Sequence, residues 1–398
     1  MTYLQTYSQL REAFSGEEPQ APLGPGLWLQ NLTFVSGGLR CPGQEGVPPP
    51  ADLQALLPGG TDLSSLFSVP DGDIRENREF RYHVVRPDGP PGRGAIILLH
   101  GFNERHWDKY LPMAAFLAGR TGKSVILFPI AFHMNRSPAL WNDARIMRKV
   151  SQWRKSVHPN VLESTLSNAA ISIRLHQDPA RFFWSGLESY ENIVSLSRTI
   201  IGGSHPAFDG PATVDFFTYS IGSFLGEIVM LADEDSLFGD SRLAIFCGGP
   251  VFNRLSPVSK FILDSEASVS LYSFLIEHLD SHRRNDPLLD GLLGSPGVGA
   301  NFRAMLNYRL DREYREGRLR DMAGRIMALA LARDEVVPPF EIINTLNGSA
   351  RDIGVRVSVA DPAYPYRHED PFPTSQRHEL EVDEWFGRIM GEFSDFLA

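Results

Sequence analysis

The chain has 398 residues, of which 42% are hydrophobic and 22% are charged, and its formal net charge at pH 7 is −10. This composition is typical of a globular protein and argues against disorder of the whole chain. The acidic balance argues against nonspecific nucleic-acid binding, because such binding needs a basic surface that neutralises phosphates.

The cysteines and the N-terminal sequence bear on the cellular compartment of the protein. Cys41 and Cys247 are too few for a disulfide framework and have no metal-ligand spacing. The first residues lack the basic segment and apolar core of a secretory signal, and no apolar run is long enough to span a bilayer. We therefore expect a cytoplasmic protein with no membrane span. The sequence does not indicate an oligomeric state.

The N-terminal part differs in composition from the rest of the chain. Residues 1–78 are rich in Pro and Gly and contain short apolar pieces at 27–29 and 32–35. The composition predicts irregular structure, while the apolar pieces need burial and indicate a few edge strands. We expect an N-terminal arm that packs on the body of the protein.

From residue 79 to residue 398, apolar strands alternate with helices. Predicted strands lie at 80–85, 95–99, 124–128, 214–219, 243–246, 325–331 and 355–360, and predicted helices lie at about 107–118, 190–201 and 379–397. This alternation predicts an α/β fold with a mostly parallel central sheet and helices on both faces. Two long insertions, at about 134–190 and 251–324, leave the carboxyl edge of the sheet, where ligands bind in such folds. We expect them to form a mainly helical lid.

The sequence around Ser220 predicts a sharp turn from a strand into a helix. The apolar strand ends at this serine, small residues follow, and a helical apolar run begins at Phe224. Such a corner lifts the serine hydroxyl clear of the sheet and points a helix N-terminus at negative charge formed there. It resembles the nucleophile elbow of the α/β-hydrolase superfamily. Thr218 stands in place of the first glycine of the usual Gly-x-Ser-x-Gly pattern.

The resemblance implies that an acid and then a histidine follow the serine along the chain. Asp334 comes directly after the strand at 325–331, and the sequence Asp-x-Val-x-Pro from this residue is similar to the acid turn of many α/β-hydrolases. Glu335 is the alternative acid. The competing interpretation is a solvated acidic pair at a helix start, where Asp is a good cap.

The expected general base is His368, in the loop that follows the last predicted strand. Flanking prolines keep this loop out of a helix. His378, at the start of the final helix, is the rival candidate, and a surface histidine without a chemical role is the other interpretation.

Backbone N–H groups stabilise the negative oxygen of a tetrahedral acyl-transfer intermediate. The N–H of Ile221, next to the serine, is one expected donor. The resemblance implies that the N–H of Phe102, in the His-Gly-Phe sequence after the strand at 95–99, is the second. We interpret His100 as structural. The segments 100–105 and 132–136 also look like an uncharacterised branch of the superfamily, and the resemblance covers residues 79–398.

Three further residues are possible substrate-binding residues. His133 and Arg136 follow the strand at 124–128 at the expected active edge, and Arg binds carboxylate or phosphate groups through two hydrogen bonds. The alternative is that they order the lid through hydrogen bonds to backbone. Tyr219, beside Ser220, is the third candidate.

These features predict a serine hydrolase that cleaves an ester, thioester or related acyl bond of a small molecule, without a metal or organic cofactor. The alternatives are an acyltransferase, C–C hydrolase or lyase on the same scaffold, because fold alone does not choose a reaction. A noncatalytic binding protein with the hydrolase fold is a further alternative, and Thr218 is the feature that favours it.

Overall fold

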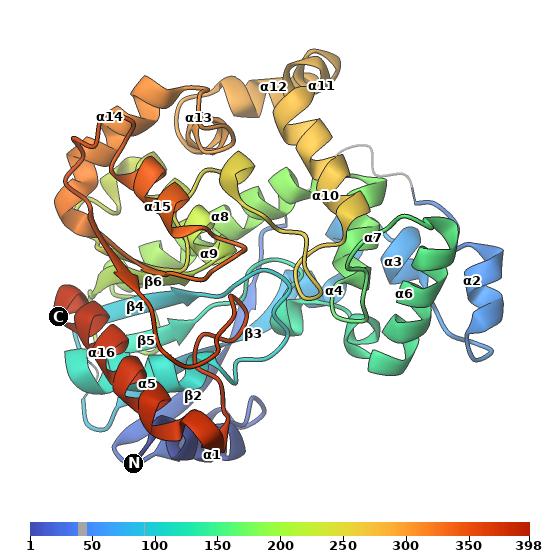
Figure 1. Ribbon diagram of the computed structural model, residues 1–398. Helices are drawn as coiled ribbons and strands as arrows, with labels where there is room; N and C mark the ends of the chain where they lie inside the picture. Colours follow the sequence, from blue (N-terminus) through green and yellow to red (C-terminus); the bar gives the residue numbers. More distant parts are fainter. Residues whose placement is uncertain (39–45, 91) are drawn as a thin grey trace.

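The computed structural model describes residues 1–38, 46–90 and 92–398, so Cys41 lies outside the described residues. Its centre is a nine-stranded sheet with the strand order β1-β2-β3-β5-β4-β6-β7-β8-β9 (Figure 1). The strands are β1 (Gln20–Gly24), β2 (Leu27–Val35), β3 (Glu79–Pro87), β4 (Gly94–Leu99), β5 (Ser124–Leu127), β6 (Thr213–Tyr219), β7 (Leu243–Phe246), β8 (Ile326–Leu331) and β9 (Arg356–Ala360). The strands from β5 to β9 pair in parallel, and β1, β2 and β3 are antiparallel to their neighbours. The predicted mostly parallel α/β fold is confirmed.

The helices surround this sheet and extend beyond one of its edges. They are α1 (Tyr3–Ala13), α2 (Ala51–Leu56), α3 (Ser64–Phe67), α4 (Arg75–Arg78), α5 (Tyr110–Thr121), α6 (Ala144–Val157), α7 (Ala169–Gln177), α8 (Arg181–Ile201), α9 (Ile221–Ala232), α10 (Ser265–Tyr272), α11 (Leu279–Asn285), α12 (Pro287–Gly294), α13 (Val298–Ala304), α14 (Arg312–Met322), α15 (Pro339–Leu346) and α16 (Glu379–Leu397). None of the helices in the described ranges combines the length and apolar character needed to cross a bilayer.

Strand β4 shows why the sheet is covered on both faces. Its side chains alternate, so that Ile97 and Leu99 join the hydrophobic cluster of α8 and α9, whereas Ile96 and Leu98 join that of α5 and α16. All four side chains are fully buried. Burial of one such side chain contributes about 1.5–3 kcal/mol to folding, so a continuously apolar strand strongly favours a position between two helical layers.

The N-terminal residues add to the sheet. β1 and β2 form a hairpin that extends the sheet beyond β3, and α1 packs against α5 and α16. The sheet therefore continues across the predicted boundary at residue 78. The division of the chain into an arm and a body stays a prediction.

Both long insertions are mainly helical, as predicted. The first contains α6 and α7, and the second contains α10 to α14, which lie above the sheet in Figure 1. Helix α10 packs on α7, and α13 packs on α9, so the two insertions contact each other and the helix that follows Ser220.

Helix α8 begins at Arg181, nine residues before the predicted start at 190. Buried Phe183, Leu187, Tyr190 and Val194 recur at intervals of four, three and four residues. This spacing is helical, so the aromatic segment that was assigned to the first insertion is the first half of one long helix.

Candidate active site

Ser220 lies at the corner between β6 and α9. Its backbone has φ 54° and ψ −121°, a conformation that residues with a side chain rarely adopt. The corner is tight because a Cβ added at Gly222 would lie only 2.5 Å from the carbonyl oxygen of Leu99. Glycine at this position therefore allows the first turn of α9 to lie against the end of β4, and strain is held at the serine.

Thr218 is accommodated by a glycine on the facing helix. Its hydroxyl lies 3.1 Å from the carbonyl oxygen of Ala244, to which it donates, and 3.0 Å from Ser223 Oγ. Its methyl group points at α9, where a Cβ added at Gly226 would lie 2.9 Å from Thr218 Cγ2. The turn at Ser220 thus forms with a threonine at this position, because Gly226 leaves room for the methyl group.

Three side chains from separate parts of the sequence meet at this corner. Ser220 Oγ lies 2.7 Å from His368 Nε2, and His368 Nδ1 lies 2.7 Å from Asp334 Oδ2. The imidazole of His368 and the carboxylate of Asp334 are buried, whereas Ser220 is partly exposed. Since a carboxylate only accepts, Nδ1–H of His368 donates to Asp334, which leaves Nε2 to accept from the serine hydroxyl.

The turn after β8 holds the Asp334 side chain. Asp334 Oδ1 accepts hydrogen bonds of 2.9 Å from the backbone N–H groups of Val336 and Val337. These bonds use one carboxylate oxygen and leave the other for His368. Glu335, the alternative acid, is exposed.

His378 does not lie at this corner. Its Nδ1 is 2.8 Å from Glu381 Oε2 at the start of α16, and its side chain is partly exposed. Of the two candidate histidines, the structure brings only His368 to Ser220.

The side chain of Tyr219 is buried in the core and lines neither the cavity above Ser220 nor the cavity between α8 and α9, which argues against the predicted contact with a substrate. It is 1% exposed, and its hydroxyl donates to the carbonyl oxygen of His368. The two rings pack with centroids 5.6 Å apart. Strand residues alternate between faces, so the neighbour of the partly exposed Ser220 is directed into the core beneath it. Tyr219 instead holds the loop that carries His368.

Among the described residues, backbone N–H groups without a partner lie on both sides of Ser220. Gly101 N donates to Tyr110 Oη at 2.8 Å, whereas the N–H groups of Phe102 and Ile221 make no hydrogen bond within the part of the chain that the structure describes. Both residues line the cavity that contains Ser220. Two backbone donors are thus available beside the serine.

His100 links two loops. Its Nδ1 donates to the carbonyl oxygen of Gly101 at 2.8 Å, and its Nε2 accepts from the N–H of Ile130 at 3.0 Å. The side chain is fully buried, and burial holds its pKa well below the usual range. This geometry agrees with a structural role for a neutral imidazole.

The cavity above Ser220 is apolar. It lies between the loop after β4 and the second insertion, and its lining includes Phe182, Ile262, Leu271 and Val337. An apolar wall excludes water and strengthens electrostatic interactions at the serine.

Arg136 is fully buried, which contradicts the prediction that it binds a substrate anion. Its guanidinium donates to Asn77 Oδ1 at 3.0 Å, to the carbonyl oxygen of Pro129 at 3.0 Å and to Glu188 Oε1 at 3.2 Å. Burial lowers its pKa to about 10, while Glu188 partly opposes the shift. The side chain orders the loop after β5, and each of its three nitrogens already donates a hydrogen bond within the protein.

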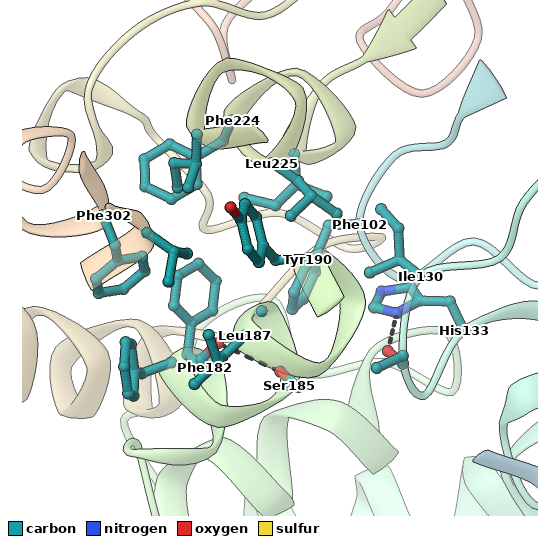
Figure 2. Close-up of a pocket in the computed structure, with 16 residues that line it drawn as sticks. Phe102, Ile130, His133, Phe182, Ser185, Leu187, Tyr190, Phe224, Leu225 and Phe302 are labelled. Carbon is teal, nitrogen blue, oxygen red and sulfur yellow. Dashed lines mark hydrogen bonds between the residues drawn. The ribbon is translucent and has the colours of Figure 1, made fainter. Parts of the chain in front are cut away.

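His133 lines a second cavity, between α8 and α9, which Figure 2 shows. Its Nδ1 lies 2.8 Å from the carbonyl oxygen of Ala131, and burial lowers its pKa to about 4. A neutral imidazole does not attract an anion, so the predicted role at a carboxylate or phosphate is not supported here.

One residue of the loop after β4 was missed from the sequence. Asn103 has φ 62°, and its Nδ2 donates to the carbonyl oxygens of Ser167 (2.7 Å) and Phe261 (2.8 Å), one in each insertion. It therefore ties the loop that carries the Phe102 N–H to both parts of the lid. The enrichment of Asn at positive φ is the signal that could have found it.

No group of three or more His, Cys, Asp or Glu side chains suited to a metal ion occurs within residues 1–38, 46–90 and 92–398.

The nine-stranded sheet, with Ser220 at the corner after β6 and His368 after β9, has the architecture of an α/β-hydrolase. The chain belongs to DUF6051, a family of unknown function, whose sequence profile matches residues 1–398. No curated protein matches the chain.

Solved structures resemble this fold only distantly. A thermostable esterase from Pseudomonas putida is 11% identical, with 99% of this chain and 88% of that chain covered and a TM-score of 0.44. Carboxyl esterase 2 from Tuber melanosporum is 10% identical, with 81% and 82% covered and a TM-score of 0.45. A peroxisomal α/β-hydrolase from Saccharomyces cerevisiae is 12% identical, with 94% and 90% covered and a TM-score of 0.43. Likenesses this remote decide nothing about activity, which has to be argued from the residues of this chain.

Proposed function

We propose that the protein is a serine hydrolase that cleaves an ester, thioester or related acyl bond. The observation that carries this proposal is the unbroken line of hydrogen bonds from Asp334 through His368 to Ser220, each 2.7 Å long. An isolated serine hydroxyl is a poor nucleophile, and it needs a base within hydrogen-bond reach and a group that orients the base.

In the proposed reaction, His368 Nε2 takes the proton of Ser220 as Oγ attacks the acyl carbonyl. Asp334 holds the Nδ1–H tautomer and stabilises the imidazolium that forms. His368 then protonates the leaving group, which departs and leaves an acyl-enzyme. Water attacks this intermediate with His368 as base, and the carboxylic acid leaves as Ser220 regains its proton.

The negative charge of each tetrahedral intermediate falls on the former carbonyl oxygen. The N–H groups of Ile221 and Phe102 are the proposed donors, because neither has another partner among the described residues. The N-terminus of α9 adds a favourable dipole at the same place. Removal of one such donor from a serine hydrolase costs about 10²–10³ in rate.

The substrate proposed for this site is a small molecule with an apolar group next to the scissile bond. The support is the lining of the Ser220 cavity, where Phe182, Ile262 and Leu271 leave no charged side chain to pair with an ionic group.

The test is covalent labelling with a fluorophosphonate, which reacts with activated serines. The purified protein should be labelled, Ser220→Ala should not, and Ser268→Ala, on α10 in the lid, should behave as the unmodified protein. Labelling that persists in Ser220→Ala, or that is missing from the unmodified protein, would refute the proposal. Product analysis with and without an added alcohol acceptor then separates hydrolysis from acyl transfer.

A further inference from the structure

A second apolar cavity adjoins the one above Ser220. It lies between α8 and α9 and is named here the α8–α9 cavity; about 630 Å³ of space inside it, including its opening to solvent, holds no protein atoms. Phe102, Phe182 and Ile221 line both this cavity and the Ser220 cavity. Because two of these residues carry the proposed oxyanion donors, a substrate held at Ser220 can extend one arm into the α8–α9 cavity.

The lining of the α8–α9 cavity is almost entirely hydrocarbon. Aromatic and aliphatic side chains surround it in Figure 2, among them Leu187, Phe224, Leu225 and Phe302. Such a wall favours an apolar group and offers nothing to a charged one.

One nitrogen in this wall has no partner. His133 is 6% exposed, and its Nε2 is buried without a hydrogen bond. Its Nδ1 lies 2.8 Å from the carbonyl oxygen of Ala131, which can only accept, so Nδ1 carries the proton. Nε2 of the neutral ring is therefore a hydrogen-bond acceptor without a donor. Burial lowers the pKa of His133 to about 4, which agrees with a neutral ring. An unpaired buried acceptor is costly and calls for an explanation.

The other polar side chains of the cavity are already used. Ser185 Oγ donates to the carbonyl oxygen of Phe182 at 3.3 Å, the dashed line beside Ser185 in Figure 2, and the Tyr190 hydroxyl donates to Glu234 at 2.9 Å. Among the described lining residues, His133 alone has a buried side-chain polar atom without a partner.

We propose that the α8–α9 cavity receives one apolar arm of the substrate, and that this arm carries a hydroxyl or N–H group that donates to His133 Nε2. This inference deepens the proposed function and rests on it, because the ligand of the cavity is a substrate only if Ser220 acts as the nucleophile. It makes His133 a specificity-determining residue that selects an apolar ligand with a single hydrogen-bond donor.

Binding of two matched probes tests the inference without any chemistry. 4-Ethylphenol and 4-ethyltoluene have nearly the same shape, and only the first can donate a hydrogen bond. We expect Ser220→Ala protein, titrated by calorimetry, to bind the phenol about three- to tenfold more tightly, the effect of one net hydrogen bond. The second substitution His133→Phe should abolish this preference. Ser185→Ala, which changes a hydroxyl of the same wall that is already paired, should keep it.

Other outcomes overturn the inference. It fails if neither probe binds, if both bind equally to Ser220→Ala protein, or if the preference survives in His133→Phe. Should His133→Phe not fold, as judged by circular dichroism, His133→Gln replaces it. Gln keeps an acceptor and a donor for the carbonyl of Ala131, so part of the preference should remain, and complete loss would count against the inference.

The outcome is separable from that of the proposed function. Protein that reacts with fluorophosphonate but does not distinguish the two probes retains the hydrolase proposal and loses this one. Protein that distinguishes the probes but is not labelled retains a selective cavity, and its ligand is then not a substrate of Ser220.

Discussion

Gly226→Ala should destabilise the protein mainly through a clash with Thr218. The added methyl group would lie 2.9 Å from Thr218 Cγ2 and 3.2 Å from Leu243 Cδ1, both inside the optimal carbon–carbon separation of about 3.5–4.0 Å. Overpacking of this kind costs about 1–3 kcal/mol, whereas Ala gains about 1 kcal/mol over Gly inside a helix. The expected net loss in the free energy of unfolding is therefore about 1 kcal/mol.

The same substitution should cost much less once the threonine methyl is gone, because only the 3.2 Å approach to Leu243 Cδ1 then remains close. In Thr218→Ala protein the nearest atom of residue 218 is Cβ, at 3.8 Å, which is an ordinary contact. In that background the helix-propensity gain of about 1 kcal/mol should offset the remaining contact with Leu243, so Gly226→Ala should be close to neutral. The double-mutant cycle should give a coupling of about 1 kcal/mol, within the range for residues in contact.

Chemical denaturation of the four proteins measures this coupling. Gly391→Ala in α16 is the matched control, because a Cβ there would meet nothing within 4 Å and only the propensity gain of about 1 kcal/mol should appear. Additivity of Thr218→Ala and Gly226→Ala within about 0.5 kcal/mol would refute the reasoning that Gly226 makes room for Thr218.

Three further predictions concern Asp334, Tyr219 and His83. Asp334→Asn should slow fluorophosphonate labelling by about 10³–10⁴, because an amide no longer selects the Nδ1–H tautomer, whereas Glu335→Gln should leave the rate unchanged; equal slowing in both would contradict the assignment. Tyr219→Phe removes the hydroxyl that holds the loop of His368 and should slow labelling about tenfold, and an unaltered rate would show that this hydroxyl positions nothing. Burial, and secondarily the neighbouring Arg81, lower the pKa of His83 to about 4, below its ordinary 6.5. The folded state is therefore favoured above pH 6.5 and loses about 1.4 kcal/mol per pH unit as the pH falls from 6.5 towards 4. In His83→Gln protein, the free energy of unfolding should fall less steeply between pH 6.5 and 4, by about 1.4 kcal/mol per pH unit. Parallel plots of the free energy of unfolding against pH for the two proteins would contradict this prediction.

Much of the fold could be predicted because its signals are local. The run Ile96 to Leu99 is apolar at every position, as expected of a strand between two covered faces, and the structure places it at the centre of the sheet. Element ends were less certain. Helix α8 was expected to begin at 190, and its true start at Arg181 depends on the packing of the aromatic residues before it.

Buried polar side chains could not be placed from the sequence. From the sequence, Arg136 in a loop at the active edge could equally bind an anion or order the loop from within the protein. The outcome depends on Glu188, its partner from a helix more than fifty residues away. The same holds for Tyr219, whose hydroxyl meets a carbonyl 149 residues further along the chain. A side chain's periodicity indicates its face, but not the partner that will satisfy its polar atoms.

The sequence by itself determined the mostly parallel sheet, because that depends on hydrophobic periodicity, and the resemblance to the α/β-hydrolases indicated the corner at Ser220 and its partners Asp334 and His368. Only the tertiary structure decided that His368 and not His378 reaches the serine, that Gly226 makes room for Thr218, and that His133, in the wall of an apolar cavity, keeps a nitrogen without a partner. These are distances between side chains on different elements, and they exist only once the hydrophobic clusters on the two faces of the sheet have packed and fixed the positions of those elements.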